Sequence, residues 1–215
     1  MKISSIMGRV NTLLKDTAWL RWPKSELLDY FNDAIRAIIL IRPDAGASNE
    51  VITCVPGTKQ SLPAGAIRLL DVIRLVDGRA IKPVPRDVLD TNYPDWHDTS
   101  GSIERYVYNE RIPKQFFVFP GAEGADQIDA ILARVPPEVL LDDIDSAAIP
   151  IDDLYVNPVI DWMMYRAFSK DAENGANSSL AAQHYQGFAE QLGMKQGAED
   201  FEQQVKQSKY TGGAV

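Results

Sequence analysis

The spacing of apolar residues changes twice along this chain of 215 residues, and this change constrains the fold more than any other feature. Over residues 3–41 apolar side chains recur at three- and four-residue intervals, the spacing of an amphipathic helix. From about Asn49 to Pro137, short β-branched and aromatic runs alternate with turn residues, a pattern typical of strands. The helical spacing returns at about Asp152. A strand-rich region therefore separates two helical ends.

Each helical end is predicted to contain two helices. At the N-terminal end, Asp16 interrupts the first apolar stripe, and Pro23 suits the first turn of a second helix because its missing N–H costs nothing there. The second helix is expected to stop at Arg42–Pro43, since the residue before a proline is pushed out of the α region. At the C-terminal end, Asn174–Gly175 separates two further helical stripes. We expect the four short helices to cover one another as an antiparallel helical bundle.

The central region is predicted to form an antiparallel sheet. The expected strands are residues 51–55, 61–63, 66–76, 80–84, 106–108, 115–119 and 127–133. Asp77–Gly78 is the strongest hairpin signal in the chain, so residues 80–84 are expected to return beside the strand that precedes the turn. Residues 86–102 contain both a helical turn pattern and a cluster of turn residues. The sequence leaves open whether this segment is a buried hook or an exposed loop.

These elements predict an α+β fold in which an antiparallel β-sheet domain is inserted into a helical bundle. The bundle is assigned to residues 1–46 and 150–195, and the inserted domain to residues 47–149. Residues 196–215 are assigned to an extended C-terminal tail, because they are polar and nearly devoid of core residues.

Composition excludes several classes of function. A net charge of -8, from 22 Lys+Arg and 30 Asp+Glu, argues against gripping nucleic acid by counterion release. The single cysteine, Cys54, excludes an internal disulfide or a multi-cysteine metal site, and two histidines leave little for a metal centre. Neither a phosphate-binding loop nor a Gly-x-Ser-x-Gly motif is present. We therefore expect no metal, no cofactor and no catalytic activity.

Targeting and membrane signals are also not expected. No stretch approaches the roughly 18 uninterrupted apolar residues of a bilayer span. The N-terminus has no long apolar core and no small-residue cleavage site. The chain is therefore expected to fold in a cytoplasm.

Trp19, Arg21 and Trp22 lie together in the loop between the first two predicted helices. Two tryptophans are costly to leave in water. They either cap the helical hairpin or anchor an interface, because tryptophan and arginine dominate interface hot spots.

An acidic stretch follows Pro136–Pro137 and contains no lysine or arginine. Its carboxylates are Glu138, Asp142, Asp143, Asp145, Asp152 and Asp153. Carboxylates that are neighbours in sequence point apart, so their adjacency is no evidence of the paired acids that hydrolysis needs. The stretch is interpreted as a solvated acidic face that packs along the surface through Leu140, Leu141 and Ile144.

The region around the tryptophans carries a family resemblance. Residues 21–36, with the sequence RWPKSELLDYFNDAIR, are followed by RPDA at residues 42–45. Together with the preceding amphipathic helix, this segment resembles the opening of head-to-tail adaptor (connector) proteins of tailed phages. It is similar to the adaptors of short-tailed phages that are often called tail tubular protein A. The order of helices, sheet, helices and polar tail fits such proteins across most of the chain.

The resemblance implies a structural virion protein at the head–tail junction that is made in the host cytoplasm. Adaptors of this kind form a dodecameric ring beneath the portal protein, extend the DNA channel and carry the tail nozzle, sometimes with fibres. DNA would pass through without specific binding, both in the filled virion and during ejection. The implied subunit or portal contacts are Trp19, Arg21, Trp22, Lys206, Lys209 and Tyr210. The implied acidic channel lining is Asp142, Asp143 and Asp145.

Two other hypotheses remain open at this point. One is a virion-associated hydrolase of the cell envelope that uses carboxylates within residues 142–153. The other is a small binding module that captures a host partner through the loop at residues 19–22.

Overall fold

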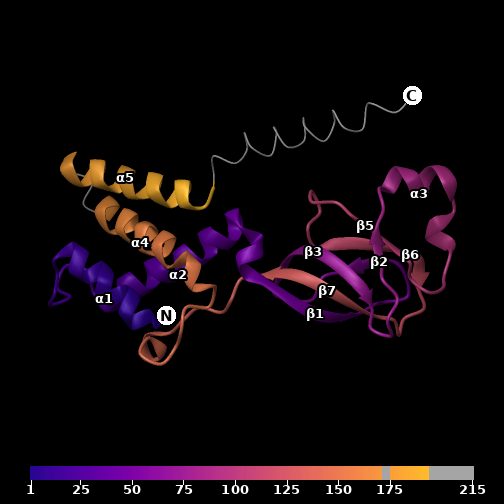
Figure 1. Ribbon diagram of the computed structural model, residues 1–215, viewed down its shortest axis with the longest axis horizontal. Helices are drawn as coiled ribbons and strands as arrows, with labels where there is room; N and C mark the ends of the chain where they lie inside the picture. Colours follow the sequence, from indigo (N-terminus) through magenta and orange to yellow (C-terminus); the bar gives the residue numbers. More distant parts are fainter. Residues whose placement is uncertain (171–174, 194–215) are drawn as a thin grey trace. The chain divides into compact units, whose positions relative to one another are not determined.

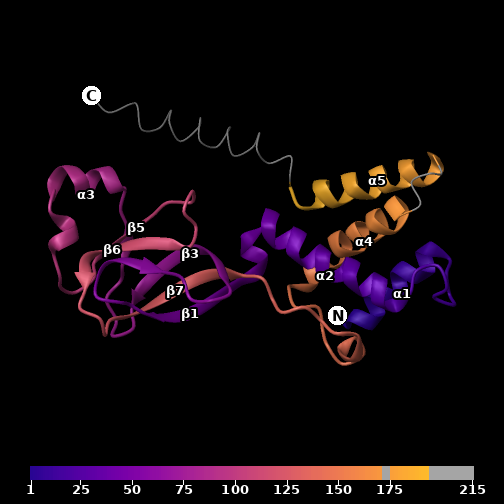
Figure 2. The same cartoon turned by 180° about the vertical axis from the view of Figure 1, so that it is seen from behind.

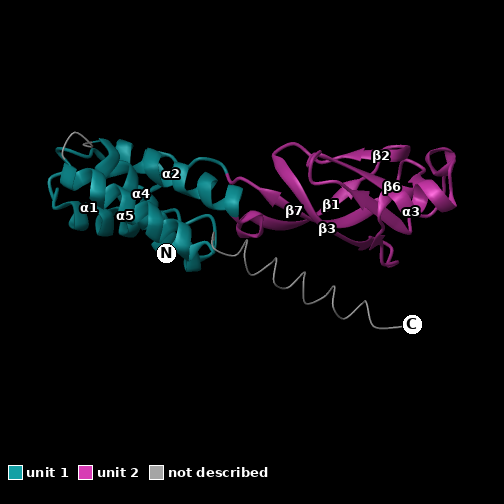
Figure 3. Cartoon of the chain, turned by 90° about the horizontal axis from the view of Figure 1, so that it is seen from above, with its two compact units in different colours: residues 1–41, 137–215 teal, residues 42–136 magenta. Residues whose placement is uncertain are grey.

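The computed structural model describes residues 1–170 and 175–193 (Figure 1). The fold is α+β, and the chain divides into two compact units (Figure 3). The helical unit comprises Met1–Ile41 and Pro137–Val215, and the β unit comprises Arg42–Pro136. The expected boundaries near residues 46 and 149 differ from these. Residues 137–149 belong to the helical unit because their backbone bonds to the start of the first helix.

Four helices form the frame of the helical unit. They are α1 (Ile3–Leu14), α2 (Lys24–Ile41), α4 (Val156–Lys170) and α5 (Gly175–Gln191). Helix α4 packs against all three others, and it lies between α5 and α2 in both views (Figures 1 and 2). The predicted apolar stripes account for this packing, because residues such as Ile6, Phe31, Ile38 and Met163 are fully buried. None of the helices described is long and apolar enough to cross a membrane.

Seven strands form two sheets in the β unit. They are β1 (Ala47–Thr53), β2 (Gly57–Ser61), β3 (Ala66–Leu75), β4 (Lys82–Pro83), β5 (Arg105–Tyr108), β6 (Gln115–Ala122) and β7 (Gln127–Arg134). One sheet has the order β1-β7-β3 and the other has the order β2-β6-β5-β4. Side chains from both sheets, among them Leu69, Phe116, Val118 and Ile128, share one core. The expectation of a single sheet was therefore wrong.

The predicted hairpin at Asp77–Gly78 forms only in part. The turn is present, and Arg74 bridges Ala80 in the antiparallel sense. The chain then leaves β3, and β4 pairs in parallel with β5 in the other sheet. Pro83 has no N–H with which to extend a ladder along β3, while the N–H groups on either side of it bond to Glu104 and Tyr106. The segment thus crosses between the two sheets.

Residues 86–102, left open by the sequence, form a hook on the four-stranded sheet. Helix α3 (Arg86–Asn92) is followed by a 3₁₀ turn, η2 (Trp96–Asp98). The Trp96 ring is buried, and its indole N–H donates to Asp90 Oδ1 at 2.9 Å. It packs edge-on against Phe117 and Phe119. These two aromatic residues therefore face away from the main core, on the outer face of the four-stranded sheet.

Candidate functional site

The loop between α1 and α2, residues 15–23 and here called the interhelical loop, is organised by Asp16. Its carboxylate accepts hydrogen bonds from the backbone N–H groups of Leu20 (3.0 Å), Arg21 (2.9 Å) and Trp22 (2.9 Å). The bond from Trp22 is the main cause that lowers the pKa of Asp16 below its ordinary value of 3.8. The backbone of Trp19 adopts a left-handed conformation with φ of 57°, which turns the chain sharply.

The two tryptophans of this loop have different surroundings. Trp22 is only 6% exposed and belongs to the helical core, so it caps the helical hairpin. Trp19 is partly exposed, and the Lys24 ammonium lies 5.3 Å from its ring centroid. The side chain that projects is Leu20, which is 83% exposed. Leu20 is not among the predicted contacts, because tryptophan and arginine are the stronger interface signal in this loop.

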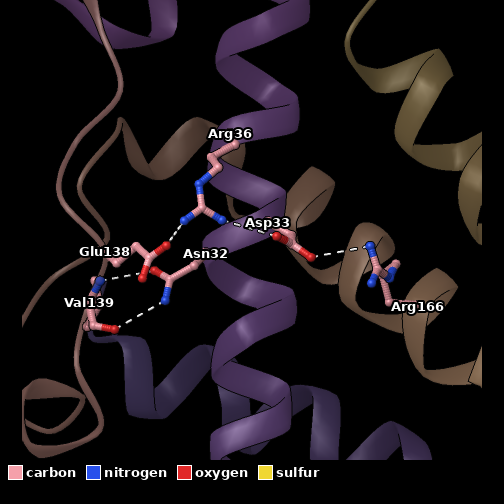
Figure 4. Close-up of polar contacts among 6 residues, drawn as sticks. All are labelled: Asn32, Asp33, Arg36, Glu138, Val139 and Arg166. Carbon is pink, nitrogen blue, oxygen red and sulfur yellow. Dashed lines mark hydrogen bonds and ion pairs between the residues drawn. The ribbon is translucent and has the colours of Figure 1, made fainter. Parts of the chain in front are cut away.

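The acidic stretch begins with residues 138–145, here called the acidic–leucine segment. Asn32 on α2 fixes its start through two hydrogen bonds with the Val139 backbone (Figure 4). Arg36 contacts Glu138 and also Asp33, at 3.1 Å. Asp33 in turn lies 3.2 Å from Arg166. A chain of polar contacts thus joins the segment through α2 to α4 (Figure 4).

Helix α1 fixes the other end of the same stretch. The N–H groups of Ile3 and Ser4 donate to the carbonyls of Ala147 (3.2 Å) and Ile144 (3.0 Å). These bonds satisfy the first helical N–H groups, which receive no side-chain cap from Lys2. The acidic–leucine segment is therefore held from both sides.

The predicted lining residues Asp142, Asp143 and Asp145 are all exposed on this segment. Leu140 and Leu141 beside them are 64% and 45% exposed, whereas Ile144 is buried. Of the three apolar residues predicted to pack along the surface, Ile144 does so, whereas Leu140 and Leu141 are left largely uncovered. The surface is thus both acidic and apolar.

Other chemistry-bearing residues lie apart from these features. Within the described ranges, no three His, Cys, Asp or Glu side chains gather in a way that could hold a metal ion. His97 Nδ1 lies 2.9 Å from Thr58 Oγ1, and His184 Nδ1 lies 2.8 Å from Asp161 Oδ1. Cys54 is buried, and burial raises its pKa to about 11. The predicted contacts Lys206, Lys209 and Tyr210 fall outside the described residues.

Two surfaces of the helical unit are held in place by hydrogen bonds and yet exposed: the interhelical loop and the acidic–leucine segment. Surfaces of this kind suit assembly with other proteins. The family model described as SU10 adaptor protein matches residues 1–209. The chain belongs to this family and is thereby a structural adaptor protein of phage. No curated protein matches it.

Proposed function

We propose that copies of this chain form a ring beneath the portal at the head–tail junction, extending the DNA channel and carrying the tail nozzle. The observation that carries the proposal is the family match over residues 1–209, which includes both units and most of the C-terminal segment. The nozzle as the partner on the tail side, with fibres as a further attachment, is proposed only from the sequence resemblance of residues 21–45 to tail tubular protein A.

Mass measurement tests this assembly directly. The purified chain is mixed with a portal ring from the same phage, and the product is weighed by native mass spectrometry. We expect a discrete complex with one adaptor per portal subunit, hence twelve on a dodecameric portal. A portal that binds its other partners but not this chain would discard the proposal.

The interhelical loop is the first proposed contact surface. Trp19 and Arg21 flank Leu20, and the Asp16 hydrogen bonds fix the backbone of Leu20 and Arg21 before any partner arrives. A preorganised loop loses little conformational entropy on binding. The proposed partner of this loop is the portal or a neighbouring subunit.

The C-terminal tail is the second proposed contact, with Lys206, Lys209 and Tyr210 binding the portal. Its polar sequence, with few apolar residues, supports a role in binding a partner. A variant that ends at residue 195 should keep its thermal melting temperature and lose portal binding. Unchanged portal binding by this truncated chain would refute the assignment of the tail.

An acidic channel wall is the third part of the proposal. Asp142, Asp143 and Asp145 are exposed, and negative charge there would repel phosphate and let DNA slide. Asp145 is the residue to mutate, because it does not adjoin the exposed leucines. A change there alters the charge of the segment and leaves its apolar surface intact. We expect Asp145→Lys to slow DNA ejection from assembled particles, with Asp145→Asn nearer to wild type. Equal ejection rates for all three proteins would contradict a channel position for Asp145.

A further inference from the structure

The outer face of the four-stranded sheet is apolar and only partly covered. Val84, Val107, Phe117 and Phe119 lie on it, and the hook formed by α3 and η2 packs Leu89 and Trp96 against them. The hook is short, so the aromatic face extends beyond it. The sequence could not show this, because alternation along β6 gives both faces of the sheet an aromatic or β-branched residue.

Two hollows remain on this face. One, of about 480 Å³, is lined by Val84, Val107, Phe117 and Ile112. The other, of about 630 Å³, is lined by Val84, Tyr93 and Phe119. They share Val84 and therefore adjoin, and we call them together the sheet trough. Their volumes fall within the ordinary range for binding sites in proteins.

Three arginines line the sheet trough. Arg86 and Arg111 line the first hollow, and Arg105 lines the second. Arg86 pairs with Asp90, which leaves Arg105 and Arg111. Within the part of the chain that the structure describes, no ion pair joins the guanidinium of Arg105 or Arg111 to a carboxylate. Two acidic residues also line the trough, and each pairs with an arginine outside it: Glu104 with Arg79 and Glu110 with Arg68. An apolar floor with two available guanidinium groups fits an apolar side chain flanked by carboxylates.

The helical unit presents a surface of this chemistry. In the acidic–leucine segment, the exposed Leu140 and Leu141 are followed directly by the exposed Asp142 and Asp143. The Asn32 contacts and the α1 N-terminus fix the backbone on both sides of these four residues. The segment is thus preorganised for docking, which reduces the entropy that binding costs.

We propose that the acidic–leucine segment of one copy docks into the sheet trough of a second copy. Leu140 and Leu141 bury against the apolar floor, while Asp142 and Asp143 pair with Arg105 and Arg111. Of the three carboxylates proposed for the channel wall, this contact leaves Asp145 as the one that stays exposed to DNA. Two different surfaces meet, so the contact is heterologous, and its repetition gives a closed ring when the rotation between copies closes. The inference rests on the proposed ring and names one of its subunit contacts.

Charge exchange tests this contact in the full-length chain assembled on the portal. One variant carries Arg105→Glu and Arg111→Glu, a second carries Asp142→Arg and Asp143→Arg, and a third carries all four changes. We expect each double variant to need at least about tenfold more protein to fill the portal ring, a loss of about 1.4 kcal/mol. The fourfold variant should recover most of the wild-type occupancy, because every pair is again of opposite charge.

Three controls test whether a loss of assembly comes from the proposed contact. Lys59→Glu, on the exposed side of β2 and outside the trough lining, should assemble like wild type. Leu140→Ser with Leu141→Ser tests the apolar half of the contact and should also weaken assembly. Circular dichroism verifies that each variant is folded.

The result also separates this inference from the proposed function. Wild-type filling of the portal by both double variants would overturn the contact and leave the adaptor assignment standing. A folded fourfold variant that assembles no better than the double variants would overturn it as well. Failure of the wild-type chain to join the portal would overturn both proposals.

Discussion

The side-chain amide of Asn32 pairs with the backbone of Val139 in both directions. Its Nδ2 donates to the Val139 carbonyl at 3.1 Å, and its Oδ1 accepts from the Val139 N–H at 3.0 Å. One side chain on α2 thus satisfies both backbone polar groups of Val139, which lies outside any helix or strand. Arg36, one helical turn further on, contacts Glu138 (Figure 4). The acidic–leucine segment is therefore attached to α2 by backbone as well as by charge.

Removing the Asn32 amide should destabilise the helical unit. Asn32→Ala leaves the partly buried N–H and C=O of Val139 without this partner, so we expect a loss of about 1–3 kcal/mol in the free energy of unfolding. Urea unfolding followed by circular dichroism measures this loss. Asn157→Ala, at an exposed position near the start of α4, is the matched control and should change stability by less than about 0.5 kcal/mol. Equal stabilities for the two variants would show that the pairing contributes nothing.

The helices could be predicted because their apolar spacing is local. Ile6, Phe31 and Met163 lie on stripes that are visible in the sequence, and all three are buried as that spacing requires. The two-sheet arrangement could not be predicted, because strand pairing joins residues far apart. Val51 pairs with Asp129 across 78 positions, and no local pattern specifies that register.

For the candidate site, the sequence allowed the types of residue to be predicted but not their arrangement in space. The tryptophans and carboxylates were visible as unusual residues in loops. Leu20 and the sheet trough were not, because an exposed leucine and a half-covered sheet face depend on how far neighbouring elements extend. How far such a side chain or sheet face is exposed is therefore known only once the chain has folded.

Asp16 should make the stability of the helical unit depend on pH. Three backbone N–H bonds lower its pKa in the folded state, so its contribution is present above the unfolded value near 3.8. The contribution is lost as the pH falls through the lower folded pKa. Asp16→Asn should therefore melt at a lower temperature than wild type at pH 7, and the difference should shrink as the pH approaches 2. The exposed Asp29→Asn is the control, and a constant difference across this range would refute the assignment.

Cys54 should be inert in the folded protein. It is 1% exposed, and burial raises its pKa to about 11, so at pH 8 it is almost entirely the unreactive thiol. We expect a disulfide reagent to label it at least about 100-fold more slowly in buffer than in denaturant. The matched control is Val55→Cys in a Cys54→Ala background. Val55 is the next residue in the chain, and it is 57% exposed. Equal labelling rates in the folded state would contradict the burial of Cys54.

Trp22 and Leu20 should separate stability from binding within one loop. Trp22→Ala removes a side chain that is 6% exposed, so we expect a loss of about 3–5 kcal/mol in the free energy of unfolding. Leu20→Ala removes one that is 83% exposed, so stability should change by less than about 0.5 kcal/mol. If the interhelical loop binds the portal or a neighbouring subunit, Leu20→Ala should nevertheless reduce occupancy of the portal ring. Thermal melts and native mass spectrometry on the same two variants give both readings. A stable Leu20→Ala protein that fills the ring normally would leave the loop with the structural role of Trp22 alone.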